Sequence, residues 1–195
     1  MTSRQKRGLL MVILGLCMVF SALRMHRTQE QQDALAGENA QVLLTRLRQP
    51  AVPVTISPQL PGMMAVKEYQ GYTMIGTLRI GQLQMELPIL STWNDEWLEL
   101  APCRYSGSLH GKNLILMGHN YKSHFTPLHN IAVGTQVEFE DVNGINYHYR
   151  VDKTEILHEN AVEQLSSDYP LTLFTCTAGG QNRLVVRCAE AEKST

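Results

Sequence analysis

The sequence has little excess charge of either sign, because 17 Lys and Arg side chains are balanced by 18 Asp and Glu side chains, which leaves a formal charge of −1 at pH 7. Proteins that bind nucleic acid usually carry a basic patch or stripe. No such stripe occurs beyond the first few residues. The charge pattern therefore argues against a nucleic-acid partner.

Cysteine is also scarce, with four residues at positions 17, 103, 176 and 188. They form no Cys-x-x-Cys pair and have no zinc-type spacing to histidine, which argues against a disulfide scaffold and a structural zinc site. Apolar residues make up 44% of the 195-residue chain, so disorder throughout is excluded and one domain with extensions is expected.

A single long apolar run covers residues 8–23 near the N-terminus. Sixteen helical residues span about 24 Å, somewhat less than a bilayer core of about 30 Å. The flanking Arg7 and Arg24 could snorkel and close this gap. The basic residues before the run place the N-terminus in the cytoplasm and the rest of the chain outside.

A cleaved signal peptide is the alternative for this run, because such peptides also have a basic start and an apolar centre. The best cleavage site, Val19-Phe20-Ser21, fits poorly. We therefore expect a cytoplasmic tail at 1–7 and an uncleaved transmembrane signal anchor at 8–24. The protein is then a single-pass protein of the cell membrane with its main domain outside.

Residues 25–74 are predicted to form a stalk or linker. Part of this stretch, 27–49, is polar with small and apolar residues at helical spacing, namely Ala36, Ala40, Leu43, Leu44 and Leu47. It is either a free stalk or a helix that packs on the following domain. Four prolines between 50 and 61 then indicate an extended linker.

From about Ile75 the sequence is typical of β-structure. Apolar and polar residues alternate with a period of two, or form short apolar runs, at 83–89, 114–117, 137–140, 145–152, 171–175 and 184–187. Short helices fit only near Asn94–Leu98 and Ala161–Leu165. The pattern predicts a mostly β domain, either a small closed barrel or a sandwich.

Cys176 is a candidate nucleophile, because it ends the strand-like run 171–175 and precedes the turn Thr177–Gly180. Positive charge from the following strand, which carries Arg183 and Arg187, would stabilise a thiolate. From spacing alone, a partly buried core cysteine is an equally good interpretation.

His119 is a candidate general acid or base, since it follows the apolar run 114–117 and a glycine. His124 and His129 follow at five-residue intervals and raise the hypothesis of a metal site. No acidic or cysteine ligand has the spacing that such a site requires, so neither a metal nor another cofactor is expected.

The run Thr172-Leu173-Phe174-Thr175-Cys176, with Gly118-His119-Asn120 before it and Arg183-Leu184-Val185-Val186 after it, resembles the sortases. Sortases are cysteine transpeptidases of Gram-positive cell surfaces. The resemblance extends from about Ile75 to Cys188 and implies a closed β-barrel of about eight strands at 75–190. The predicted signal anchor agrees with the topology of the family.

The resemblance assigns the catalytic cysteine to Cys176, the histidine to His119 and the arginine to Arg183. Arg187 is a second candidate for the arginine, because two residues four apart on one strand can face the same side. Thr175 and Asn120 are candidates for substrate contacts or for supporting contacts.

The family chemistry implies that a C-terminal sorting signal similar to Leu-Pro-x-Thr-Gly is cleaved through a thioester on the enzyme. The acyl group then passes to an amine from a cell-wall peptide or a pilin lysine. The expected partners are thus surface or pilin proteins that carry the signal, the amine acceptor and the membrane. The expected role is to attach surface proteins to the cell wall.

Several alternatives remain open. A pilin-polymerising sortase is less favoured, because the segment before the barrel has no Asp-Pro-aromatic lid, whereas a helix at 27–49 would suit class B sortases. A non-catalytic interaction barrel and a protease that uses water as acceptor are also possible. An L,D-transpeptidase would carry a histidine where Phe174 stands.

Overall fold

The computed structural model describes residues 3–49 and 64–191. The chain divides into two compact units, and the division falls between Leu35 and Ala36. The predicted proline-rich linker, 50–61, lies outside the described residues.

Helix α1 (Ser3–Arg48) contains both the predicted membrane anchor and the predicted stalk helix, so these two segments form one continuous helix. All side chains from Leu10 to position 32 are exposed. An 18-residue window of this helix has a mean hydropathy of 1.5 and no buried residue, which makes α1 a candidate membrane span. The exposed apolar surface is what a helix in lipid requires.

The last three turns of α1 belong to the second unit and pack on it. Ala36, Ala40, Leu43 and Leu44 are buried at the helical spacing seen in the sequence. The Lys67 ammonium group donates hydrogen bonds to the carbonyl oxygens of Leu47 and Gln49, at 2.7 and 2.8 Å, and so binds the C-terminal end of the helix. Of the two alternatives for 27–49, the structure therefore has the packed helix over its second half.

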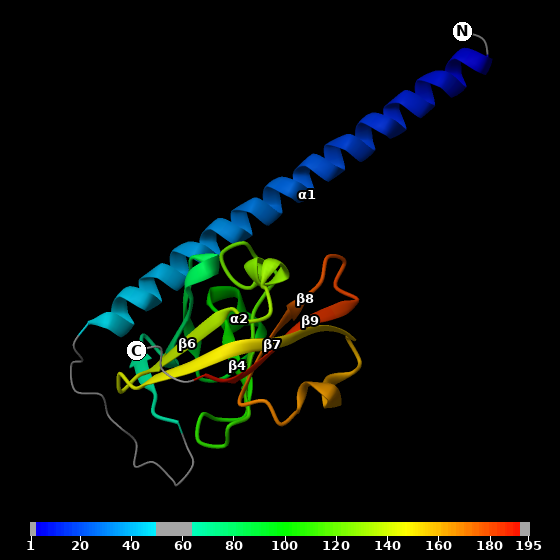
Figure 1. Ribbon diagram of the computed structural model, residues 1–195. Coiled ribbons are helices and arrows are strands. Elements are labelled where there is room, and N and C mark those ends of the chain that lie inside the picture. Colours follow the sequence, from blue (N-terminus) through cyan, green and yellow to red (C-terminus); the bar gives the residue numbers. More distant parts are fainter. Residues whose placement is uncertain (1–2, 50–63, 192–195) are drawn as a thin grey trace. The chain divides into compact units, whose positions relative to one another are not determined.

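The second unit is built mainly from strands (Figure 1). They are β1 (Lys67–Tyr69), β2 (Tyr72–Ile80), β3 (Met85–Leu90), β4 (Cys103–Ser106), β5 (Leu114–Met117), β6 (Gln136–Asp141), β7 (Asn146–His158), β8 (Leu171–Cys176) and β9 (Asn182–Glu190). Helix α2 (Asp95–Leu100) and the short 3₁₀ turns η1 (Gly81–Leu83), η2 (Thr126–Asn130) and η3 (Val162–Leu165) connect them.

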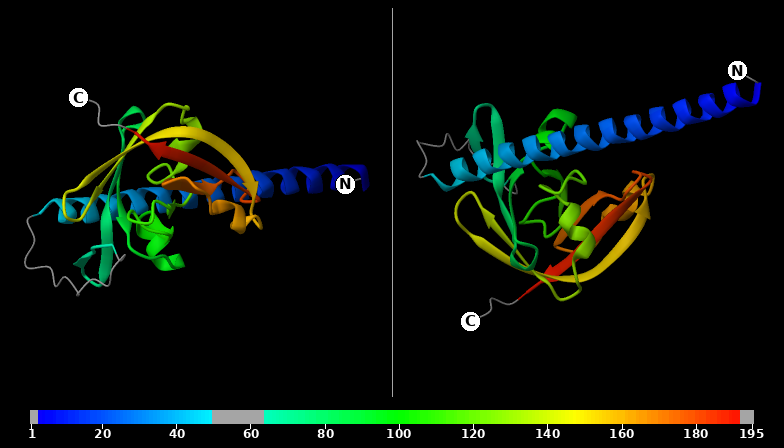
Figure 2. Two further views of the ribbon diagram at one scale, coloured as in Figure 1. Left: turned by 60° about the horizontal axis from the view of Figure 1, so that its bottom comes forward. Right: turned by 90° about the horizontal axis from the view of Figure 1, so that it is seen from above.

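Eight of these strands close into a barrel. Their order is β2-β3-β4-β5-β8-β9-β7-β6, and β6 pairs again with β2, while β1 adds a short hairpin to β2. Figure 2 shows β7 and β9 curving together along one side of this barrel. The predicted closed barrel of about eight strands is confirmed.

The strand boundaries differ from the predicted ones in three places. Leu83 lies in turn η1 and not in β3, and the strands of the second unit begin at Lys67 rather than near Ile75. Strand β7 continues to His158, where the sequence predicted an end near Asp152. The residues after Asp152 have little apolar alternation, and their strand is set by pairing with β9.

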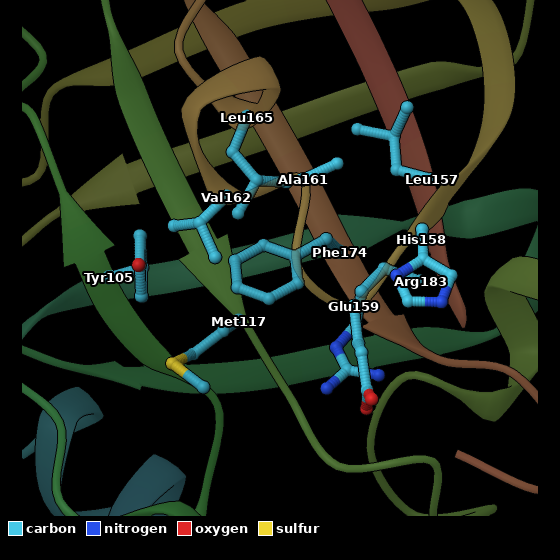
Figure 3. A pocket seen from close by; sticks show the side chains of 10 residues that line it. All are labelled: Tyr105, Met117, Leu157, His158, Glu159, Ala161, Val162, Leu165, Phe174 and Arg183. Carbon is cyan, nitrogen blue, oxygen red and sulfur yellow. The ribbon is translucent and has the colours of Figure 1, made fainter. Parts of the chain in front are cut away.

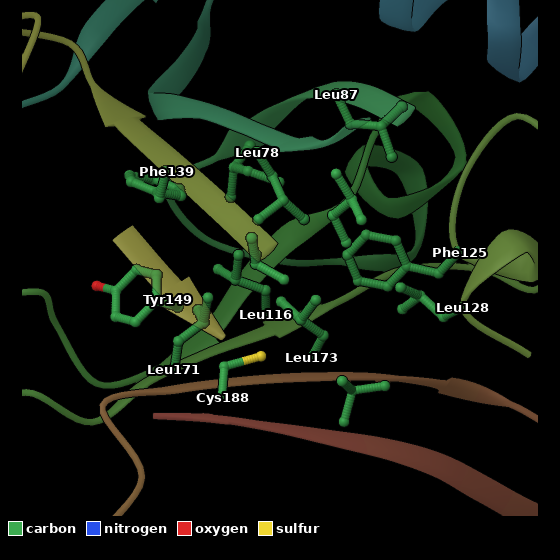
Figure 4. Packing of buried hydrophobic residues seen from close by; sticks show 14 of the residues in the cluster. Leu78, Leu87, Leu116, Phe125, Leu128, Phe139, Tyr149, Leu171, Leu173 and Cys188 are labelled. Carbon is green, nitrogen blue, oxygen red and sulfur yellow. The ribbon is translucent and has the colours of Figure 1, made fainter. Parts of the chain in front are cut away.

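The barrel interior is filled by apolar side chains from every wall (Figure 4). Leu116 of β5, Leu173 of β8 and Cys188 of β9 lie in this core. Phe125, from the segment after β5, is also fully buried here. A Cβ atom at Gly118 would lie 2.7 Å from the Phe125 ring, so the chain can pass over this ring only because residue 118 is glycine.

Candidate active site

The three predicted catalytic residues lie at one end of three neighbouring strands. Strands β5 and β8 run parallel, and their last paired residues are Met117 and Phe174. His119 and Cys176 each follow two residues after this pair, and the Gly118 N–H donates to the Phe174 carbonyl at 3.2 Å, which extends the pairing. On the other side of β8, Cys176 pairs directly with Arg183 of β9. Residues far apart in the sequence are thus brought together by strand register.

Cys176 lies on the outer face of the barrel, because side chains alternate along β8 and its neighbour Thr175 points to the interior. Cys176 is half-buried, whereas Cys103 and Cys188 are fully buried. Burial raises the pKa of both core thiols to about 12. Within the described part of the second unit, Cys176 is therefore the thiol that a substrate can reach.

Arg183 provides the positive charge next to this thiol. One of its terminal nitrogens donates to the carbonyl oxygens of Gly180 and Asn182, at 2.7 and 3.1 Å, which fixes the guanidinium group against the turn after β8. No carboxylate forms an ion pair with Arg183 among residues 3–49 and 64–191. The charge is therefore held in place but not neutralised.

Arg187 faces the same side of β9 as Arg183, as the spacing predicted, but it has a different environment. It is only 3% exposed. Its nitrogens donate to Glu155 Oε1 at 2.8 Å, to the Leu165 carbonyl at 2.6 Å, to Ser167 Oγ at 3.0 Å, to Thr172 Oγ1 at 3.2 Å and to the Gln164 carbonyl. Arg187 is thus fully engaged in holding the segment 161–169 on the barrel, which favours Arg183 as the arginine of the site.

We call the outer face around Cys176 and Arg183 the open end, and the outer face around Thr172 and Arg187 the sealed end. A pocket of about 160 Å³ lies between them (Figure 3). Its lining is mostly apolar and consists of Tyr105, Met117, Leu157, His158, Glu159, Ala161, Val162, Leu165, Phe174 and Arg183. Because Arg183 lines the pocket and also pairs with Cys176, the pocket opens beside the thiol.

Thr175 and Asn120, the two further candidates for the site, differ in how exposed their side chains are. Thr175 is 1% exposed and faces the barrel interior, which favours the supporting role over a direct substrate contact, and both stay predictions. Asn120 Oδ1 accepts a hydrogen bond from Thr126 Oγ1 at 2.9 Å, which ties the loop after His119 to turn η2. Asn120 remains partly exposed, so both of its predicted roles stay predictions.

The histidines at five-residue intervals do not form a cluster of ligands. His124 is fully buried, whereas His129 is exposed. In the described ranges 3–49 and 64–191, no group of three or more His, Cys, Asp or Glu side chains could hold a metal ion.

One contact of the site was not identified in the sequence. Glu99 of α2 places its Oε1 atom 3.3 Å from His119 Nε2, and its Oε2 atom accepts a hydrogen bond from the Tyr121 hydroxyl at 2.8 Å. No motif links Glu99 to His119, because the contact arises only when α2 packs beside the loop after β5.

Comparison with known proteins agrees with this geometry. The sequence model of the sortase domain matches residues 78–191. A search of curated proteins found no match.

Several solved structures are similar in fold. Sortase C1 of pilus island 1 from GBS is 23% identical, with a TM-score of 0.59 over 85% of this chain and 84% of that one. A sortase D5 transpeptidase from Clostridium perfringens is 11% identical, with a TM-score of 0.59 over 82% and 99%. Streptococcus agalactiae sortase C1 in complex with MTSET is 24% identical, with a TM-score of 0.55 over 63% and 71%. Together with the barrel and the matched domain, which covers more than half of the sequence, these findings place the chain in the sortase family.

Proposed function

We propose that this chain is a membrane-anchored cysteine transpeptidase. In this proposal it cleaves a C-terminal sorting signal similar to Leu-Pro-x-Thr-Gly and transfers the acyl group to an amine. The observation that carries the proposal is the register of three strands, which pairs Cys176 with Arg183 and puts His119 at the same strand ends. A nucleophile, an acid or base, and a fixed positive charge are what acyl transfer through a thioester requires.

The first half of the reaction forms the thioester. The Cys176 sulfur attacks the carbonyl carbon at the cleavage point, and negative charge develops on the carbonyl oxygen. Arg183, whose charge has no ion-pair partner in the described part of the chain, stabilises this oxygen through a charge-assisted hydrogen bond. The C–N bond then breaks, and the leaving amine takes a proton from the His119 imidazolium.

The second half reverses the proton transfer. An incoming amine attacks the thioester carbonyl, and His119, now neutral, accepts a proton from its nitrogen. The new amide forms and the Cys176 thiolate leaves. This chemistry needs no metal or organic cofactor.

The proposed topology follows the order of the sequence. A cytoplasmic tail at 1–7 and a signal anchor at 8–24 precede the stalk and linker, which the sequence predicted at 25–74, and the catalytic barrel, predicted at 75–190, whose first strand, β2, begins at Tyr72 in the structure. The exposed apolar surface of α1 supports the anchor. In this arrangement the barrel lies outside the cell, where surface proteins and cell-wall amines are found.

The proposed role is the attachment of surface proteins to the cell wall. The alternative is the polymerisation of pilins, and one structural relative is a sortase C1 of a pilus island. The amine distinguishes these roles, since a cell-wall peptide amine serves the first and a pilin lysine serves the second.

The proposal can be tested with the full chain in detergent micelles. We would incubate it with peptides that carry different sorting signals, add either a cell-wall peptide amine or a lysine peptide, and follow adducts by intact mass. We expect an acyl adduct on Cys176 that disappears when the amine is added. A Cys17→Ser background removes the other accessible thiol, and Cys176→Ala is the matched variant without the nucleophile.

The outcomes separate the alternatives. Loss of the adduct to water, with no amide product, would indicate a protease. No adduct with any peptide, together with resistance of Cys176 to a thiol reagent, would contradict the enzyme and favour a non-catalytic interaction barrel. Cys103 and Cys188 should stay unlabelled at pH 8 in the folded chain, because burial raises their pKa values to about 12.

A further inference from the structure

Glu99 contacts the predicted catalytic histidine with one carboxylate oxygen, while its other oxygen is hydrogen-bonded to Tyr121. Its Oε1 atom lies 3.3 Å from His119 Nε2, and its Oε2 atom accepts from the Tyr121 hydroxyl at 2.8 Å. The Tyr121 ring also lies against the His119 ring, with centroids 4.8 Å apart and a tilt of 31°. The imidazole is thus held at one edge by Glu99 and on one face by Tyr121.

Helix α2 gives Glu99 a fixed position. The helix begins at an N-cap, where Asn94 Oδ1 accepts from the Trp97 N–H at 2.7 Å. Leu98, the residue before Glu99, is buried in a cluster with Met74, Leu90 and Cys103. Because the helix is both capped and anchored in the core, the carboxylate is presented to His119 from a rigid element.

We propose, on the basis of the proposed transpeptidase function, that Glu99 is a positioning residue for His119. The carboxylate accepts a hydrogen bond from Nε2–H and fixes the orientation and tautomer of the ring. Nδ1 is then the ring nitrogen that exchanges protons with the substrate amines. A carboxylate commonly selects the protonated nitrogen of a histidine in this way.

The proton then follows a defined path. When the C–N bond of the sorting signal breaks, the proton on Nδ1 moves to the leaving amine and the ring becomes neutral. When the incoming amine attacks, its proton moves to Nδ1 and the ring becomes an imidazolium again. Nε2 keeps its proton in both steps, and Glu99 takes no part in the proton transfer.

The solvent exposure of Glu99 and His119 indicates whether their contact affects folding stability or turnover. The Glu99 side chain is 49% exposed and that of His119 is 30% exposed. Ion pairs this exposed add little to folding stability. The contribution of Glu99 should therefore be seen in turnover and in the state of the His119 ring, not in the unfolding temperature.

The first test is independent of activity. Long-range ¹H–¹⁵N spectra of the full chain in micelles, labelled with ¹⁵N-histidine and assigned with His119→Gln, show which ring nitrogen carries the proton at a pH where the ring is neutral. We expect the Nε2–H tautomer in the wild type and a mixture of tautomers in Glu99→Gln. A wild-type ring protonated on Nδ1 would overturn the proposal.

The second test is kinetic and has a matched control on the same helix. We expect Glu99→Gln to lower kcat about 10-fold with KM changed less than about twofold, because a misaligned acid or base slows the chemical steps without weakening binding. Glu99→Asp should recover part of the rate. Glu96→Gln removes an exposed carboxylate from the first turn of the same helix and should behave as the wild type.

The two proposals can fail separately. If the wild type forms and resolves a thioester while Glu99→Gln matches Glu96→Gln, the positioning role is wrong and the transpeptidase stands. If the wild type forms no thioester with any signal peptide, the transpeptidase is wrong, and the tautomer experiment still decides whether Glu99 orients the ring.

Discussion

The open end and the sealed end of the outer barrel face use the same residue type in opposite ways. Both present an arginine from the same face of β9, four residues apart. At the sealed end Arg187 is buried and donates hydrogen bonds to three other segments, so its guanidinium group stabilises the fold and is not available to a substrate. At the open end Arg183 is held only by nearby carbonyl groups and remains available. The neighbouring segment, 161–169, covers one arginine and leaves the other beside the thiol.

The largest expected effect concerns the open end. Cys176→Ala should lower transpeptidation at least about 10⁴-fold, because the thioester cannot form without the nucleophile. The unfolding temperature should change little, since the thiol is on the outer face. Residual transfer within about tenfold of the wild type, measured by product mass, would mean that another group carries the acyl chain.

The next expected effect separates the two arginines by activity. Arg183→Ala should lower kcat by about 10²–10³-fold, which is the usual cost of removing a group that stabilises an oxyanion. Thermal unfolding should shift only slightly. If the variant instead unfolds early and keeps its activity per folded molecule, Arg183 has the structural role that we assign to Arg187.

The third effect is on stability and concerns the sealed end. Arg187→Met should lower the free energy of unfolding by about 3 kcal/mol, because buried carbonyl groups lose their donors and Glu155 loses one of its two cationic partners. Urea unfolding measures this loss. Arg150→Met, on an exposed position of β7, is the control and should change stability by less than about 0.5 kcal/mol. Equal stabilities of the two variants would contradict the contrast between the ends.

The contrast explains what the sequence could and could not predict. Strands with regular alternation, such as β6, were identified from residues alone, because one face of each is buried. The resemblance of their motifs to a family predicted that His119 and Cys176 share one site, and the structure puts both residues just beyond the last pair of β5 and β8. The spacing of Arg183 and Arg187 did not decide which of them is the arginine of the site. A strand pattern predicts which face of the strand a side chain lies on, but not which other segment covers that face.

Two other features depend on tertiary contacts that leave no local pattern. The end of β7 is polar or exposed on both faces and exists because β9 pairs with it. Glu99 looks like any solvated helix carboxylate in the sequence, and only the packing of α2 gives it a partner. Sequence reasoning therefore named the groups that we propose to react and missed the carboxylate that we propose to orient one of them.

The smallest expected effect is a pH dependence of the sealed end. Burial opposes ionisation of Glu155, but hydrogen bonds from Arg187 and Lys153 outweigh it and lower its pKa below the ordinary 4.5. Because the folded pKa is depressed, this stabilisation is fully present above about pH 4.5 and is lost as the pH falls through the folded value. The contribution should be about 1 kcal/mol at most.

Urea unfolding of the wild type and Glu155→Gln at several pH values measures this dependence. The difference in stability should be constant from pH 7 to pH 5 and shrink at lower pH. Glu163→Gln, at an exposed position of η3, is the matched control and should show no such change. A difference between wild type and Glu155→Gln that persists at pH 3 would show that the carboxylate charge is not the cause.

The parallel pairing of β5 with β8 also affects how the site comes into being during synthesis. Its paired residues are 57 positions apart along the chain, from Leu114 with Leu171 to Met117 with Phe174. Strand pairs with such long sequence separation form late, because the entropy of closing the intervening loop must be overcome first. In the proposed topology, a newly made chain therefore crosses the membrane before His119 lies beside Cys176, whereas Arg183 is only seven residues away on the next strand and can pair with Cys176 early. The proposed active site is therefore complete only when the barrel closes, and a chain that has not yet closed its barrel carries the thiol without the histidine.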